Sequence, residues 1–127
     1  MTGQVIWITG LSGAGKTTLA NGLNLRLQKR GSRPILLDGD VLRDIFKTES
    51  FGKPSFDRKA RINLGTKYGL LCKTLSAQGF TVIISTISMF DTIYHWNREN
   101  IENYLQVYLK VPLSELYLRD QKKIYHI

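Results

Sequence analysis

The strongest constraint on the fold is the stretch Gly10–Thr17, which reads GLSGAGKT. It matches the phosphate-binding pattern G-x-x-x-x-G-K-[ST] at every fixed position. An apolar run at Val5–Ile8 precedes it and predicts a buried strand, and leucines at helical spacing follow it from Leu19 onward. A strand, a glycine-rich turn and a helix in this order favour a polyphosphate site over the alternative, a chance turn with a surface lysine.

The residue types in this stretch suit a nucleoside triphosphate. Glycines let the backbone turn tightly and approach the phosphates, and the N–H groups at a helix start supply positive charge. We expect Lys16 to neutralise charge on the β- and γ-phosphates and the Thr17 hydroxyl to ligate Mg²⁺. The predicted ATP-binding residues of the loop are Gly10, Leu11, Ser12, Gly13, Ala14, Gly15, Lys16, Thr17 and Thr18.

Strand patterns alternate with helical patterns along the whole chain. We predict strands at 4–9, 34–38, 80–86 and 105–111, and helices at 16–29, 41–46, 56–77, 91–103 and 112–120. This alternation predicts an α/β fold in which helices cover both faces of a parallel sheet. At 127 residues the chain is predicted to be one domain, 1–127.

Composition narrows the classes of function. The net charge of +8 raises the question of nucleic acid, but the basic residues are scattered, which favours phosphate-rich small molecules. We expect no membrane span, because no apolar run is long enough, and no signal peptide, because the chain enters a strand at once. The single cysteine, Cys72, excludes a disulfide framework and favours a cytoplasmic setting.

Polar residues follow the predicted strands at their carboxyl ends, where parallel sheets bind ligands. Asp38 and Asp40 close the second strand, and Ser85, Thr86 and Ser88 close the third. We predict that Asp38 organises Mg²⁺ or accepts the proton of an attacking hydroxyl. Asp40 either joins this site or caps the helix that we expect to follow it.

Three arginines are candidates to bind a second anionic group. Arg43 lies three residues after Asp40 and is either an anion clamp or a solvated helix residue. Arg58 and Arg61 lie one turn apart and suit phosphate or sulfate, although a surface ion pair between Arg58 and Asp57 is the alternative. Aromatic residues that could stack on a base, although core packing is expected for most, are Phe51, Phe56, Phe90, Tyr94 and Trp96.

These residues together make the chain resemble the adenylylsulfate (APS) kinases, a branch of the P-loop kinases. The residues that carry the resemblance are 7–18, Leu37-Asp38-Gly39-Asp40 with Arg43, Asp57-Arg58, Ile87-Ser88, and Arg119-Asp120 with Lys122 and Tyr125. The resemblance implies a P-loop kinase fold and transfer of the γ-phosphoryl group of MgATP to the 3′-hydroxyl of APS, as in sulfate assimilation.

The resemblance also implies roles for individual residues. Lys16 and Asp38 would be catalytic, Thr17 and Asp38 would serve the metal, and Arg119 would lie near ATP. Arg43, Arg58 and Ser88 would line the acceptor nucleotide site, where we also predict Asp40, Arg61, Ile87 and Lys122. The predicted partner is a small nucleotide, with no nucleic acid and no membrane, and a homodimer is left open.

The chain departs from the family pattern on the acceptor side. Arg61 stands where the family usually has asparagine, Lys53 where it has an aromatic, and Met89-Phe90-Asp91 where it has Pro-Tyr-Arg. The Ser-Met-Phe pattern with Trp96-Asn97-Arg98 resembles APS kinase-like proteins of surface-polysaccharide modification, some of which phosphorylate cytidine diphosphoramidate. That substrate is the alternative acceptor, and a catalytically weak ATP-binding module is the alternative function.

Length is the last departure. Family members continue for several tens of residues beyond the Arg119-Asp120 segment, with a mobile lid and a fifth strand. We therefore expect this chain to be C-terminally truncated and to lack the lid and the last strand.

Overall fold

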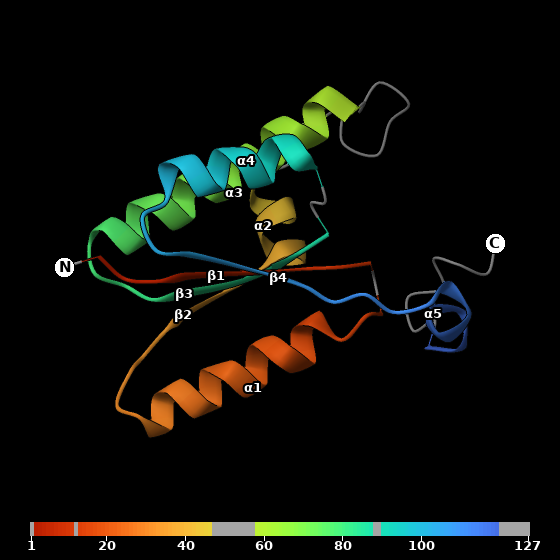
Figure 1. The fold of residues 1–127 in the computed structure, drawn as a ribbon, viewed down its shortest axis with the longest axis horizontal. Helices are drawn as coiled ribbons and strands as arrows, with labels where there is room; N and C mark the ends of the chain where they lie inside the picture. The colour runs from red at the N-terminus through yellow and green to blue at the C-terminus, as the bar shows by residue number, and fades with distance from the viewer. Residues whose placement is uncertain (1, 12, 47–57, 88–89, 120–127) are drawn as a thin grey trace.

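The protein is a four-stranded parallel sheet with helices on both faces (Figure 1). The computed structural model describes residues 2–11, 13–46, 58–87 and 90–119. The elements in chain order are β1 (Val5–Thr9), α1 (Lys16–Lys29), β2 (Ile35–Asp38), α2 (Gly39–Phe46), α3 (Arg58–Ala77), β3 (Val82–Thr86), α4 (Asp91–Asn100), β4 (Tyr104–Tyr108) and α5 (Leu113–Arg119). The strand order is β2-β3-β1-β4. All three pairings are parallel, which agrees with the parallel sheet that the sequence predicts.

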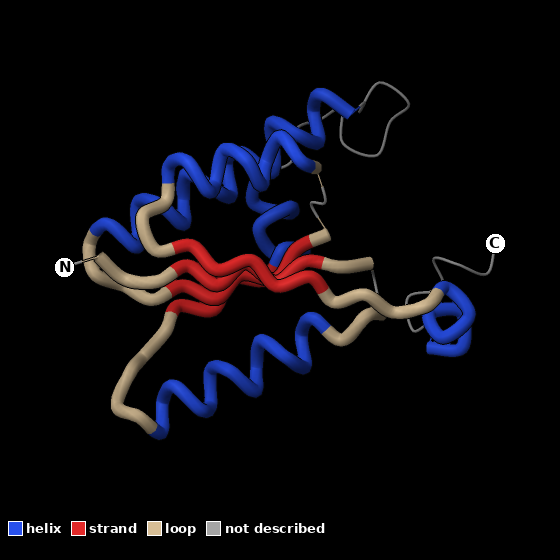
Figure 2. Tube along the Cα trace, in the orientation of Figure 1, coloured by secondary structure: helices blue, strands red, loops and turns tan. Residues whose placement is uncertain are grey.

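The layers follow from the apolar character of the central strands. Every residue of β1 and β3 is buried, whereas the outer strands β2 and β4 are partly exposed. Helix α1 covers one face of the sheet, and α2, α3 and α4 lie on the other (Figure 2). Two hydrophobic clusters result, one on each face of the sheet.

The larger cluster lies between the sheet and α2, α3 and α4. We call it the α3/α4 core; its buried members are Val5, Trp7, Leu42, Tyr68, Cys72, Val82, Ile84, Ile93 and Ile101. The smaller one, the α1 core, contains Ile6, Ile8, Ala20 and Ile83, with Leu19, Leu23, Leu27, Val107 and Leu109 packed against it. Odd and even positions of β1 therefore serve opposite faces, as the pleat requires.

Helices α4 and α2 each have a boundary that differs from the sequence prediction by two or three residues. Helix α4 ends at Asn100 and not at 103, because Ile101 leaves the helix with extended backbone (φ −106°, ψ 118°) and buries its side chain in the α3/α4 core. Helix α2 begins at Gly39, two residues earlier than predicted, so Asp40 lies within its first turn. No helix in the described part of the chain is both long and apolar enough to cross a membrane.

Candidate active site

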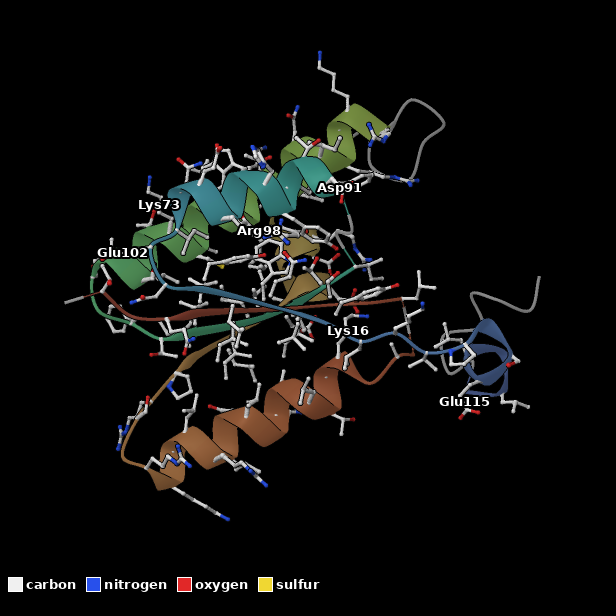
Figure 3. All side chains as sticks on the ribbon, in the orientation of Figure 1. Lys16, Lys73, Asp91, Arg98, Glu102 and Glu115 are labelled. Atoms are coloured by element: carbon white, nitrogen blue, oxygen red, sulfur yellow. The ribbon has the colours of Figure 1, made fainter. Side chains whose placement is uncertain are left out.

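The carboxyl edge of the sheet gathers the predicted site residues. Thr9 pairs with Thr86 at the ends of β1 and β3, and Asp38 pairs with Ser85 at the end of β2. Lys16 comes to this edge from α1 on one face, and Asp91 lies above the same edge at the start of α4 on the other face (Figure 3). The predicted crevice thus has contributions from both helical layers.

The glycine-rich loop has the backbone that its sequence predicts. Gly13 and Gly15 have φ values of 85° and 100°, a backbone conformation that residues other than glycine rarely adopt. Gly15 is also the N-cap of α1, so the loop turns directly into the helix start. The Lys16 Nζ donates to the carbonyl oxygens of Gly10 (2.9 Å) and Leu11 (3.0 Å). The ammonium is therefore held at the loop by the loop's own backbone.

Helix α5 packs against the same loop. The Leu116 side chain is fully buried, and a Cβ placed on Gly13 would lie 3.8 Å from the Leu116 Cδ2. Arg119 ends this helix, so its backbone belongs to the element next to the loop. Thr17 and Thr18 are exposed in the first turn of α1.

Asp38 and Gly39 form the start of α2 at the end of β2. The Asp38 Oδ1 accepts a hydrogen bond from the Asp40 backbone N–H (2.7 Å). The capping role therefore belongs to Asp38, and the prediction that Asp40 caps this helix is wrong because the helix starts earlier. A Cβ on Gly39 would lie 2.5 Å from the Ser85 carbonyl oxygen, so only glycine lets this turn approach β3 so closely.

Arg43 extends from the first turns of α2 and is held by Asp40. The Arg43 Nη1 lies 3.4 Å from the Asp40 Oδ1, with the two side chains 38% and 44% exposed. Tyr68 of α3 is buried and contacts the Phe46 ring of α2 (centroids 6.3 Å apart). Burial raises the pKa of the Tyr68 hydroxyl to about 12, although the charge of Arg43 opposes the shift.

Arg58, the first residue of α3, meets Phe90, which immediately precedes α4. The Arg58 Cζ lies 5.3 Å from the centroid of the Phe90 ring, within cation–π range. Arg61 is exposed one turn further along α3. The sequence-predicted pairing of Arg58 with Asp57 involves a residue outside the described part of the chain.

A further contact joins α4 to the strand before the phosphate loop. The Tyr94 hydroxyl donates to the Thr9 hydroxyl at 3.4 Å, and Thr9 directly precedes Gly10. Burial raises the pKa of Tyr94, and the hydrogen bond to Thr9 partly opposes that shift. Sequence reasoning treated Tyr94 only as a candidate for stacking, because no local pattern shows which strand a helix residue will reach.

Several predicted residues lie outside what the structure describes. Ser12, Ser88 and Lys122 are among them, as is the side chain of Arg119. Ile87 follows β3 and is 41% exposed at the same sheet edge. For the rest, the elements that carry Lys16, Asp38, Asp40, Arg43 and Arg58 begin or end at the carboxyl edge, and Arg58 and Arg61 are both exposed at the start of α3.

The residues present fit Mg²⁺ bound together with a nucleotide. Among the described residues, no group of three or more His, Cys, Asp or Glu could hold a metal ion by itself. Mg²⁺ commonly takes only one or two protein oxygens and completes its shell with phosphate and water oxygens. The exposed hydroxyl of Thr17 beside the loop and the carboxylate of Asp38 are suited to supply those protein oxygens.

The parallel sheet, the glycine-rich loop and the lysine held within it define a P-loop nucleotide-binding fold. Comparison with known proteins gives the family. A family described as adenylylsulphate kinase matches residues 2–127, nearly the whole chain. The chain belongs to the adenylylsulfate kinase family.

Two curated relatives are named for different acceptor substrates. Cytidine diphosphoramidate kinase of Campylobacter jejuni is 42% identical over 121 residues, which cover 95% of this chain and 68% of that protein. Adenylyl-sulfate kinase of Pseudomonas aeruginosa is 40% identical over 123 residues, which cover 95% of this chain and 61% of that protein. The chain thus spans about two thirds of the length of these relatives.

A solved structure supports the fold and the family. The Mycobacterium tuberculosis APS kinase CysC, in complex with AMPPNP and APS, superposes with a TM-score of 0.83 at 26% identity. The match covers 98% of this chain and 72% of that one.

Proposed function

We propose that the chain transfers the γ-phosphoryl group of MgATP to a sugar hydroxyl of an activated nucleotide, one whose phosphate carries a further group. The observation that carries this proposal is the arrangement of the carboxyl edge. The phosphate loop occupies one part of it, and Asp38, Arg43 and Arg58 come from separate elements around the rest. Cationic groups beyond the phosphate loop suit a second anionic molecule.

The donor site is the loop with the first turn of α1. The loop's N–H groups and the helix start would bind the ATP phosphates, and the Lys16 ammonium would neutralise their charge. Thr17 and Asp38 would hold Mg²⁺, which supplies further charge neutralisation on the phosphoryl oxygens when bound. Arg119 is proposed to lie near ATP because α5 packs against the loop.

The chemical step is an in-line displacement at phosphorus. The bond between the γ-phosphorus and the β–γ bridging oxygen breaks, a bond from the acceptor hydroxyl oxygen to phosphorus forms, and ADP leaves. The hydroxyl proton passes to the Asp38 carboxylate. The Asp38 Oδ1 already accepts from the Asp40 N–H, which fixes the orientation of the carboxylate at the end of β2.

The acceptor would lie on the α2, α3 and α4 side of the crevice. Arg43 and Arg58 would bind its anionic groups, with Arg61, Ile87, Ser88 and Lys122 around it as the family resemblance implies. Asp40 acts here through Arg43, to which it is bound at 3.4 Å.

Two acceptors are proposed, and cytidine diphosphoramidate stands first. The Campylobacter relative that acts on it is 42% identical, and Arg61 and Asp91 depart from the APS kinase pattern on the acceptor side. APS is the second candidate, supported by the family as a whole and by the Pseudomonas relative. A cytoplasmic location fits ATP as donor and a single buried cysteine.

The test is phosphoryl transfer to a panel of acceptors. The protein is incubated with MgATP and either cytidine diphosphoramidate, APS, CDP or AMP, and products are identified by mass spectrometry and ³¹P NMR. We expect a product one phosphoryl group heavier from the first acceptor, and none from AMP. Binding of ATP with no product on any acceptor would contradict the proposal and would favour a nucleotide-binding module.

A further inference from the structure

Phe90 occupies a position where its residue type is unusual. It is the N-cap of α4, with extended backbone (φ −113°, ψ 130°), and its side chain makes no capping hydrogen bond. Ser, Thr, Asp and Asn are strongly preferred at this position, because their side-chain oxygens accept from the first free N–H groups of the helix. Capping therefore does not explain the phenylalanine.

The ring of Phe90 has two neighbours of different kinds. It packs against the α3/α4 core, and the Arg58 guanidinium carbon lies 5.3 Å from its centroid. The contact joins the first residue of α3 to the residue immediately before α4. Because the core anchors the ring, the ring gives the guanidinium a fixed surface to lie on.

Arg58 differs from Arg43 in how it is held. Arg43 is bound to the carboxylate of Asp40, which offsets part of its charge. Within the described residues, Arg58 has the aromatic ring as its contact and no carboxylate within ion-pair distance. A cation–π contact orients a guanidinium without adding a counter-charge, so the contact with Phe90 does not itself weaken the attraction of Arg58 for an anionic ligand.

We propose that Phe90 is a positioning residue for the acceptor: its ring holds the Arg58 guanidinium, fully charged, toward the anionic group of the acceptor nucleotide. The inference rests on the proposed function and adds a specific task for a side chain that neither caps its helix nor bears a charge. Loss of the Phe90 ring should therefore raise the acceptor KM and leave the ATP KM and kcat unchanged.

The experiment compares Phe90→Leu with Phe90→Tyr in steady-state transfer from MgATP to cytidine diphosphoramidate. Leucine keeps an apolar group against the core but removes the aromatic face, so we expect the acceptor KM to rise about two- to fivefold. The ATP KM and the saturated rate should stay at the wild-type values. Phe90→Tyr keeps the aromatic face and should retain the wild-type acceptor KM.

Ile93→Val is the matched control for a general loss of packing. Ile93 lies in α4, is buried in the same core, and has no aromatic face to offer Arg58. It should lower stability without changing the acceptor KM. An unchanged acceptor KM in Phe90→Leu, an equal rise in Ile93→Val, or failure of tyrosine to restore the value would each overturn the inference.

Failure of the proposed function would give a different experimental result. It would show as no product from the wild-type protein with any acceptor. In that event calorimetric titration of cytidine diphosphoramidate into the same variants decides the inference, because Phe90→Leu should then weaken binding by the same factor. A wild-type protein that binds no acceptor, or equal affinities for wild type and Phe90→Leu, would overturn it.

Discussion

The proposed donor and acceptor sides of the carboxyl edge are built in different ways. The donor side, which comprises β1, the loop at 10–17 and α1, is one continuous segment whose binding groups are largely backbone N–H groups and one lysine. The acceptor side takes single side chains from the starts of α2, α3 and α4, which are far apart in the sequence. A continuous backbone site is specified locally, whereas the acceptor side depends on how three helices pack.

This difference predicts which changes each side tolerates. The donor loop should tolerate no loss of its lysine, because one residue supplies the side-chain charge. The acceptor side should be sensitive to helix placement, because its charges are held by neighbours such as Asp40 and Phe90. The predictions below use that contrast, from the largest expected effect to the smallest.

Replacing Lys16 should have the largest effect. Lys16→Ala removes the ammonium held at the carbonyls of Gly10 and Leu11, and with it the charge that offsets the transferring phosphoryl group. We expect kcat to fall by about a hundredfold or more, with the fold intact. Lys29→Ala, at the exposed end of α1, is the control and should leave the rate unchanged. Equal activity of Lys16→Ala and wild type would show that the loop is not the donor site.

Two glycines, one on each side, should respond to alanine in opposite directions. In Gly39→Ala the new Cβ would lie 2.5 Å from the Ser85 carbonyl oxygen and 3.0 Å from the Thr86 Cα, so β3 and the α2 start must separate. We expect the free energy of unfolding to fall by about 1–3 kcal/mol, and transfer to fall with it.

Gly22→Ala is the matched change on the donor side. Nothing lies within 4 Å of a Cβ placed on this exposed residue of α1. Alanine should stabilise the helix by about 0.5–1 kcal/mol, because it loses less conformational freedom on folding than glycine does. Urea unfolding of both variants measures the contrast, and destabilisation of both by similar amounts would refute the tight approach at Gly39.

Alkaline pH should weaken the α3/α4 core before the α1 core. Burial raises the pKa of Cys72 from its ordinary 9.0 to about 12, and those of Tyr68 and Tyr104 from 10.0 to about 12. Each raised pKa contributes stability that is complete below the unfolded value and is lost as pH rises toward the folded value. The residues of the α1 core carry no titratable side chain.

The free energy of unfolding should therefore decline between about pH 9 and pH 12. Equilibrium unfolding across that range gives the size of the effect. Hydrogen exchange should locate the first loss of protection in α3 and α4. Earlier loss of protection in α1 would contradict the assignment to the α3/α4 core.

The contact between Tyr94 and Thr9 should have the smallest effect. Its 3.4 Å length marks a weak hydrogen bond between the helix of the acceptor side and the strand before the donor loop. Tyr94→Phe should lower the free energy of unfolding by about 0.5 kcal/mol, the low end for a hydrogen bond, and leave the core intact. A thermal melt measures the loss, with Tyr108→Phe as an exposed control. No change would mean that the contact does not couple the two sides.

Much of the donor side could be predicted from the sequence because its signals are local. The GLSGAGKT loop lies between a buried strand and a leucine-patterned helix, and glycine spacing alone predicted the turn at Gly13 and Gly15. The alternation of strands and helices also predicted the parallel sheet. Such patterns do not predict the order of the strands, which the structure gives through the pairing of β1 with both β3 and β4.

The acceptor side could be predicted only in part. Asp38 was predicted from its place at a strand end, and Arg43 and Arg58 from their spacing, but the neighbours of all three depend on packing. The switch of the capping role from Asp40 to Asp38 followed from a helix that begins at Gly39, a residue that commonly interrupts helices. The contact of Arg58 with Phe90 joins the starts of two helices, which no local pattern places together.

The most direct test of the separate donor and acceptor sides is the rate of transfer over a grid of ATP and cytidine diphosphoramidate concentrations, for wild type and Arg58→Leu. The account predicts an acceptor KM raised about tenfold or more, as expected for loss of a charged contact, with the ATP KM within about twofold of wild type. Parallel increases in both KM values, or no change in either, would contradict it.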